Sequence, residues 1–244
     1  VVVTLSCLLR EPGSVMAHDG YGVPIIVTRD QNGTARAFLN ACQHKGAMLI
    51  EDSEIHKVSR LTCPYHAWTY GLNGDLVGVP RESSFGSLDK TCKGLKSLPC
   101  KEVGGLIWVI LDKDAEPDFS ILGPDLRADL DSLELEHSHC YGRKTFHVNA
   151  NWKLVMEPFL EAYHVRRLHS TTVGPMFEDV SGIFDVIDGY HTRQISGRGD
   201  FTPDMLDIPD ENVHKIATMT WQLLPSTVLI GSPYYFSVMI VIPT

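Results

Sequence analysis

The chain has 244 residues, 43% of them hydrophobic, and a formal net charge of −9 at pH 7. A chain of this length can bury one large core or two modest ones, and we expect two domains. The acidic balance argues against a nucleic-acid surface, which needs a basic patch, and the longest apolar runs are far shorter than the roughly 20 residues of a membrane span. We therefore expect a soluble, cytoplasmic protein with neither nucleic acid nor membrane as a partner.

Strand and turn patterns fill residues 1–113. Residues 23–41 hold two apolar runs around an Asn-Gly turn, residues 68–78 hold further strand and turn signals, and residues 106–111 form an apolar strand. These patterns predict an all-β domain. The acidic, proline-containing residues 112–120 are typical of a link to a second domain.

Helical and strand patterns alternate in the rest of the chain. Leucines at helical spacing predict a helix over residues 124–136, and residues 151–170 predict a second one with a kink or a fresh start at Pro158. Residues 182–196 contain an Asp-Gly turn between strands, and residues 218–243 predict at least two more strands.

Two cysteine–histidine pairs stand in the first domain. They read Cys42-x-His44, then eighteen intervening residues, then Cys63-x-x-His66. A structural zinc site also uses two cysteines and two histidines, but a zinc finger takes both cysteines from one limb and both histidines from the other. One cysteine and one histidine in each of the two segments is instead typical of a two-iron cluster, in which two thiolates hold one iron and two imidazoles hold the other.

The charge of such a cluster supports this interpretation. Two ferric ions and two sulfides sum to +2, so two thiolates and two neutral imidazoles leave zero, whereas four thiolates leave −2. A neutral cluster accepts an electron more easily, which gives these centres higher potentials than all-cysteine ones.

The surrounding residues resemble the Rieske family. The stretches LNACQHKGAML and LTCPYHAWTYGLNGDL are similar to its two cluster loops. The resemblance implies that Cys42 and Cys63 hold one iron of a [2Fe-2S] cluster and that His44 and His66 hold the other. Ala67 departs from the family, where a glycine is common.

A second motif follows in the second half of the chain. Glu161, His164 and His169 form Glu-x-x-His-x4-His. Two histidines and a carboxylate are the usual ligands of non-haem Fe(II). Glu161 and His164 are neighbours on a helix face, but five residues leave His164 and His169 about 140° apart on an ideal helix, so joint ligation requires a π-type turn or a bend.

The two motifs together resemble the catalytic (alpha) subunit of Rieske non-haem iron oxygenases, which include aromatic ring-hydroxylating dioxygenases and related demethylases. The resemblance implies a Rieske cluster, and a mononuclear Fe(II) held by His164 and His169. It also implies an α+β fold, with an all-β Rieske domain over residues 1–113. The N-terminal part of a helix-grip catalytic domain with an antiparallel sheet follows over residues 114–244.

The family's activity follows from the same resemblance. A ferredoxin or an NAD(P)H-dependent reductase supplies electrons through the cluster to the mononuclear Fe(II), which uses O2 to hydroxylate an aromatic ring or to demethylate a methylated amine. Subunits form a head-to-tail homotrimer or a multiple of three. Glu161 takes the place of the carboxylate that bridges the iron histidine to a Rieske histidine of the neighbouring subunit, and His66 is the expected partner.

Two departures from the family bear on the substrate and the iron ligands. Most members have aspartate at the bridging position, and the subset with glutamate resembles enzymes that oxidise methylated quaternary amines. The family's third ligand is an aspartate more than a hundred residues beyond the second histidine, and the family usually has a further segment before the first residue of this chain. We therefore expect this chain to be part of a longer protein that continues at both ends. Asp179, Asp185 and Asp188 lie nearby in sequence, but no pattern selects any of them.

Two other functions remain open from the sequence. A Rieske-type electron-transfer protein without its own catalytic site would need only the first domain's motif, and a structural zinc protein would need only its four ligands.

Overall fold

A computed structural model describes residues 1–178, 182–199, 202, 204–205 and 213–243. The chain divides into two compact units, Val1–Leu122 with Arg127–Lys144, and Gly123–Leu126 with Thr145–Pro243. Each unit is described by itself. The predicted boundary after residue 113 stays a prediction.

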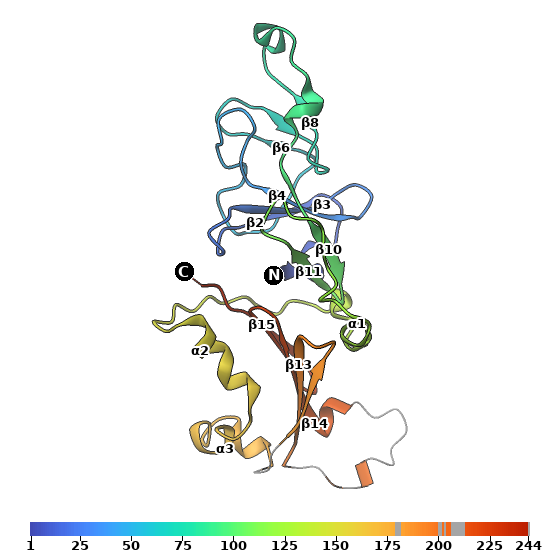
Figure 1. Ribbon diagram of the computed structural model, residues 1–244, viewed down its shortest axis with the longest axis vertical. Coiled ribbons are helices and arrows are strands. Elements are labelled where there is room, and N and C mark those ends of the chain that lie inside the picture. The colour runs from blue at the N-terminus through green and yellow to red at the C-terminus, as the bar shows by residue number, and fades with distance from the viewer. Residues whose placement is uncertain (179–181, 200–201, 203, 206–212, 244) are drawn as a thin grey trace. The chain divides into compact units, whose positions relative to one another are not determined.

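Antiparallel sheets build the first unit (Figure 1). The strand orders are β5-β2-β3-β4-β9, β1-β11-β10 and β6-β7-β8. The strands are β1 Val2–Leu5, β2 Ser14–His18, β3 Ile25–Arg29, β4 Ala35–Leu39, β5 His56–Lys57, β6 Leu61–Thr62, β7 Thr69–Tyr70, β8 Leu76–Gly78, β9 Ser97–Leu98, β10 Cys100–Val103 and β11 Leu106–Val109. Short 3-10 helices join them, namely η1 Ser6–Leu9, η2 Glu82–Phe85, η3 Lys90–Lys93 and, later, η4 Leu135–His137.

The prediction of an all-β first domain is confirmed, because no α-helix lies within residues 1–113, all of which the structure describes. Gly33 has φ +80, so the Asn-Gly turn connects β3 to β4 with the left-handed backbone that glycine adopts without strain. One hydrophobic cluster of this unit contains Val27 and Ile107. A second contains both cysteines of the predicted cluster site together with Trp68 and Tyr70.

The predicted helix over residues 124–136 is shorter in the structure. α1 spans Pro124–Asp131, with Pro124 as its first residue, as expected of a proline in a first turn. Glu134 then takes a left-handed backbone, φ +48, before η4 begins.

One antiparallel sheet organises the second unit, in the order β12-β13-β14-β15-β16. Its strands are β12 Ile183–Ile187, β13 His191–Gly197, β14 Ala217–Leu223, β15 Thr227–Gly231 and β16 Phe236–Ile240. Asp188 and Gly189 have φ +52 and +76 in the hairpin between β12 and β13, which is the backbone that an Asp-Gly hairpin turn requires. The α+β fold class and its antiparallel second sheet are therefore confirmed.

Short helices of the second unit lie to one side of this sheet (Figure 1). They are α2 Trp152–Met156, η5 Glu157–Leu160, α3 Val165–Leu168 and η6 Gly174–Met176. A separate 3-10 helix, η8 Val213–Lys215, directly precedes β14. Gln222 of β14 donates a hydrogen bond of 3.1 Å to the carbonyl of Met156, and both residues are buried. This contact fixes the end of α2 against the sheet.

The predicted helical stretch over residues 151–170 is divided in the structure into α2, η5 and α3. Asn151 caps α2 by accepting a hydrogen bond from the amide of Lys153 at 3.0 Å. The fresh start predicted at Pro158 is confirmed, because α2 ends at Met156 and η5 begins at Glu157 with Pro158 in its first turn, where a proline is tolerated. A further break follows at Glu161, whose backbone is extended at φ −149 and ψ 157. Among the described residues, no helix is long and apolar enough to cross a membrane.

Candidate metal centres

The first cysteine–histidine loop follows β4 and is held by Asn40. This buried side chain donates to the carbonyl of Ile50 at 2.7 Å and accepts from the amide of Leu49 at 2.9 Å. Within the loop, the Cys42 amide donates to the carbonyl of Ala47 at 2.8 Å. Asn40 therefore joins the two ends of the loop, so that the loop keeps one shape without regular secondary structure.

The second loop lies between β6 and β7 and closes on itself. The Cys63 amide donates to the carbonyl of Trp68 at 2.9 Å, and the Ala67 amide donates to the carbonyl of Cys63 at 3.0 Å. Ala67 has φ +56, a left-handed backbone that costs a residue with a Cβ atom more than it costs glycine. This conformation explains why a glycine suits the position better.

The two loops bring the four predicted cluster ligands into one region. Cys42 and Cys63 are both free thiols, 2% and 3% exposed, and both belong to the hydrophobic cluster beneath the loops. The rings of His44 and His66 lie 4.6 Å apart between centroids, at an angle of 66°. The structure thus supplies a buried thiol pair and a neighbouring imidazole pair.

Hydrogen bonding at the loops fits a bound cluster. Nδ1 of His44 is buried and has no hydrogen-bond partner within the described part of the chain, and a buried nitrogen without a partner carries a desolvation cost that ligation of iron would remove. Burial, and then the neighbouring His66 and Lys45, lower the pKa of His44, which favours the neutral imidazole that a metal requires.

Tyr70 supports the first loop from below. Its hydroxyl accepts from the amide of Gln43 at 3.0 Å and contacts Sγ of Cys42 at 3.2 Å. Burial, and then the Cys42 thiol, raise the pKa of Tyr70, so its hydroxyl keeps its proton. A neutral hydroxyl beside the sulfur is compatible with a thiolate ligand, because it can donate a hydrogen bond to that sulfur.

Glu161 and His164 are in direct contact in the second unit. Oε1 of Glu161 meets Nδ1 of His164, and Oε2 accepts from the backbone amide of His164 at 3.1 Å. Burial alone raises the pKa of Glu161, but the side-chain and backbone hydrogen bonds from His164 outweigh it and lower that pKa. The carboxylate therefore stays charged and leaves Nε2 of His164 as the nitrogen available to a metal.

The route to this contact differs from the prediction. Glu161 lies outside any helix and contacts both the ring and the backbone amide of His164, whereas a shared helix face was expected. The neighbourhood of the two residues was predicted correctly, but its geometry was not.

His164 and His169 flank the single turn of α3. Their ring centroids lie 5.5 Å apart at an angle of 67°. Of the two expected alternatives, a π-type turn or a bend, the π-type turn is absent between them, since the amides of Leu168 and His169 donate to the fourth carbonyl back, at 2.7 and 3.1 Å. Instead the helix ends at His169, where the backbone turns to φ −101 and ψ 26.

Gly174 makes that helix end possible. Its amide donates to the carbonyl of His169 at 2.8 Å, and a Cβ atom at this position would lie only 2.7 Å from the same oxygen. Only a glycine therefore lets the following chain fold back onto His169.

The structure assigns other contacts to two carboxylates that the sequence left open. Asp185 forms an ion pair with Arg193 at 3.1 Å, and Asp188 accepts from the amide of Leu126 at 2.9 Å. Asp179 lies outside the described residues. Across the described ranges, no three His, Cys, Asp or Glu side chains gather around one point as a single metal ion requires. The two imidazoles fit part of a mononuclear iron site, and no third candidate ligand side chain joins them among the described residues.

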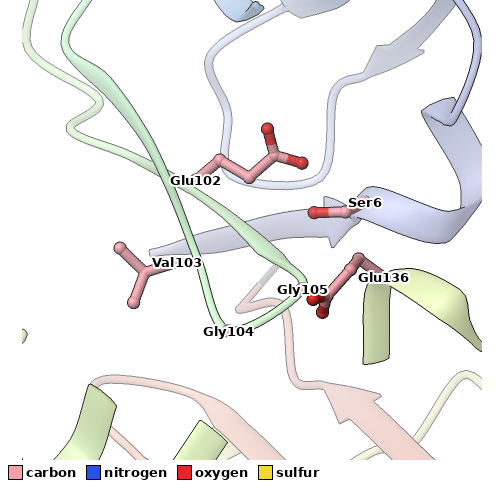
Figure 2. Close-up of a pocket in the computed structure, with 6 residues that line it drawn as sticks. All are labelled: Ser6, Glu102, Val103, Gly104, Gly105 and Glu136. Carbon is pink, nitrogen blue, oxygen red and sulfur yellow. The ribbon is translucent and has the colours of Figure 1, made fainter. Parts of the chain in front are cut away.

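The first unit also has a polar pocket (Figure 2). Its lining contains none of the predicted metal ligands and consists of Ser6, Glu102, Val103, Gly104, Gly105 and Glu136. The carboxylate of Glu102 in this pocket is already paired with Arg29 through two hydrogen bonds of 2.5 and 2.7 Å. The pocket is thus no part of either candidate centre.

Comparisons with known proteins agree with this arrangement. Residues 1–99 match the Rieske [2Fe-2S] domain, and residues 135–244 match the ring hydroxylating alpha subunit (catalytic domain). The glycine betaine monooxygenase oxygenase subunit of Pseudomonas aeruginosa is 30% identical over 178 residues, which cover 73% of this chain and 41% of that subunit. The large oxygenase component of the naphthalene 1,2-dioxygenase system of Pseudomonas putida is 33% identical over 181 residues, which cover 70% of this chain and 39% of that component.

A solved structure shows the same fold. The quaternary ammonium Rieske monooxygenase CntA, in complex with an inhibitor, superposes with a TM-score of 0.85 at 22% identity, covering 100% of this chain and 64% of that chain. The chain spans about two fifths of the length of the curated relatives named above, at 41% and 39%. Both modules are present in order, and together they imply a Rieske cluster and a mononuclear iron. The chain therefore belongs to the Rieske non-haem iron oxygenase family, among its alpha subunits.

Proposed function

We propose that this protein is the terminal oxygenase component of a multi-protein system. It takes electrons from a ferredoxin or an NAD(P)H-dependent reductase and uses O2 to oxidise a small organic substrate. The observation that carries the proposal is the presence, in one chain, of the paired Cys/His loops and of the Glu161–His164 contact beside His169. An electron carrier without its own catalytic site would need only the loops.

In this proposal Cys42 and Cys63 hold one iron of the [2Fe-2S] cluster, and His44 and His66 hold the other. The burial of the thiols and the partnerless Nδ1 of His44 within the described residues support the assignment. When bound, the two metal groups supply one-electron transfer and the activation of O2 at iron.

His164 and His169 hold the mononuclear iron, with a third carboxylate from outside the described residues. The role of Glu161 is to orient His164, because its carboxylate engages both the ring Nδ1 and the backbone amide of that residue. A hydrogen bond from a charged carboxylate also raises the basicity of an imidazole ligand.

Glu161 has a second role in the proposed assembly. A carboxylate oxygen has two lone pairs, so Glu161 can accept a further hydrogen bond from His66 of a neighbouring subunit in a head-to-tail trimer. His66 is available for such a contact, since its ring lies against Tyr65, which is 65% exposed. Electrons would then pass between subunits, and the isolated monomer would be inactive.

The proposed substrate is an arene or a methylated amine. Named relatives act on both classes, since one is a glycine betaine monooxygenase subunit and another a naphthalene 1,2-dioxygenase component. Glutamate at position 161, where most members have aspartate, favours the methylated quaternary amine.

The test uses the purified, complete protein with its reductase or a substitute ferredoxin system. Iron analysis is expected to give three irons per chain, and EPR of the reduced protein is expected to show a Rieske signal. Oxygen uptake and product formation are then compared between glycine betaine and naphthalene. Two irons per chain and no product with either substrate class would instead indicate a pure electron carrier. Bound zinc and no EPR signal would reject both the oxygenase and the electron carrier.

A further inference from the structure

The two imidazoles of the candidate cluster site have unequal surroundings. His44 lies flat against Trp68, with ring centroids 4.9 Å apart at an angle of 7°, and Trp68 is only 3% exposed. The ring of His66 instead lies against the largely exposed Tyr65, at 3.8 Å and 34°. His44 is therefore the shielded member of the pair.

Phe85 completes the shield from outside both cluster loops. Its ring meets His44 edge-on at 5.9 Å and 84°, and it meets Trp68 at 5.8 Å and 77°. Three rings thus contact one another pairwise, in the stacked and edge-to-face arrangements that aromatic rings favour. Trp68 thus contacts the face of the His44 ring, and Phe85 adds a second, nearly perpendicular contact to the same ring.

The segment that carries Phe85 is braced. Phe85 ends η2, and the Ser84 amide donates to the carbonyl of Arg81 at 2.8 Å. Glu82, at the start of η2, forms an ion pair with Lys90 at 3.1 Å. Leu88, between the two, packs on the hydrophobic cluster beneath the loops. Phe85 itself is 43% exposed, so burial in the core does not account for its position.

We propose that Phe85 is a positioning residue for His44, which fixes the plane of this ligand together with Trp68 and keeps water from its side of the [2Fe-2S] cluster. The inference rests on the proposed ligation of the cluster by His44.

The sign of the expected effect follows from charge. With two thiolates and two neutral imidazoles, the oxidised cluster carries no net charge and the reduced cluster carries −1. Water stabilises the charged form, so a shield that excludes water disfavours reduction. Removing the Phe85 ring is therefore expected to raise the midpoint potential.

The test compares Phe85→Ala, Phe85→Leu and Phe85→Tyr with the parental protein. Spectroelectrochemistry at pH 7 gives the midpoint potential, and loss of visible absorption in the presence of an iron chelator gives the rate of cluster loss. Phe85→Ala is expected to raise the potential and to speed cluster loss. The expected increase in the rate of cluster loss is roughly 2- to 10-fold, which corresponds to the interaction free energy of one aromatic pair. Phe85→Leu is expected to lie between, and Phe85→Tyr to restore parental values. Tyr141→Ala is the matched control, because Tyr141 is a fully exposed aromatic residue of the same unit.

An unchanged potential and an unchanged rate of cluster loss in Phe85→Ala would overturn the proposal, as would equal shifts in Tyr141→Ala. Should Phe85→Ala fail to accumulate, Phe85→Leu decides by the same two measurements. A failure of the proposed function has a different signature, because the parental protein itself would then lack the Rieske EPR signal.

Discussion

Glu161→Gln separates coupling between the iron centres from iron binding. The substitution keeps the shape of the side chain but removes its charge. Oε1 then loses a charged contact with Nδ1 of His164, and the hydrogen bond of 3.1 Å from the His164 amide becomes a neutral one. Because the Glu161 side chain is 46% exposed, the loss in stability is expected to stay below about 1 kcal/mol.

The loss in function is expected to be much larger. Carboxylates that hold a metal-bound imidazole typically contribute about 10- to 100-fold in metal affinity or activity. With iron in excess, both metal groups should remain bound and the cluster should still be reducible. Product formation should fall about 10- to 100-fold, and Glu161→Asp should keep partial activity because it retains the charge with a shorter reach.

The assay measures single-turnover oxidation of the reduced cluster in the presence of substrate and O2. Stopped-flow absorption monitors the oxidation, and the iron content of each variant is measured alongside. Glu157→Gln is the matched control, because Glu157 is an exposed glutamate of η5 four residues earlier, and it should behave as the parental protein. Parental cluster oxidation in Glu161→Gln would refute the bridging role. Loss of the mononuclear iron even with iron in excess would instead show that Glu161 acts in iron binding and not only in coupling.

Three further predictions concern the ligands and the fold. His66→Ala should abolish the Rieske EPR signal and turnover together, whereas His56→Ala, which removes only an exposed contact, should change neither; a normal signal in His66→Ala would contradict the ligand assignment. His164→Ala should remove one iron per chain and leave the Rieske absorption intact, and iron analysis that shows both populations lost would refute the independence of the two centres. Asp30, whose side chain is 5% exposed, accepts from Arg36 at 2.7 Å. Burial raises the pKa of Asp30, but the hydrogen bond from Arg36 and two backbone hydrogen bonds outweigh burial and lower that pKa. The resulting stability is present above about pH 3.9 and is lost as the pH falls through the lower folded value. Asp30→Asn should therefore cost about 1–2 kcal/mol in urea unfolding at pH 7, and the difference should shrink toward pH 2; a constant difference would argue against the pKa shift.

Local chemistry in the sequence was enough to predict the cluster loops and most strands. A cluster needs ligands of fixed type at short spacing. Each pair of candidate ligands, Cys42 with His44 and Cys63 with His66, can therefore be recognised without any knowledge of distant contacts. The hairpin turn at Gly33 is likewise local, because its positive φ depends on the residue itself.

The mononuclear site was only partly predictable. The spacing of Glu161, His164 and His169 identified the residues, and the ideal-helix angle showed that a regular helix could not bring both rings together. The solution that the chain adopts, an early helix end stabilised by Gly174, depends on a backbone approach of 2.8 Å that periodicity does not encode.

Sequence alone gave no sign of the role of Phe85. It lies seventeen residues beyond Trp68, in a segment without helical or strand periodicity, and it remains 43% exposed. Its place beside His44 depends on the ion pair of Glu82 with Lys90 and on the packing of the surrounding segment. The sequence by itself thus determined which residues are the candidate iron ligands, because ligand chemistry belongs to single side chains. The tertiary structure decided how those ligands are oriented and shielded, because these properties depend on contacts between segments whose pairing is set by packing of the whole unit.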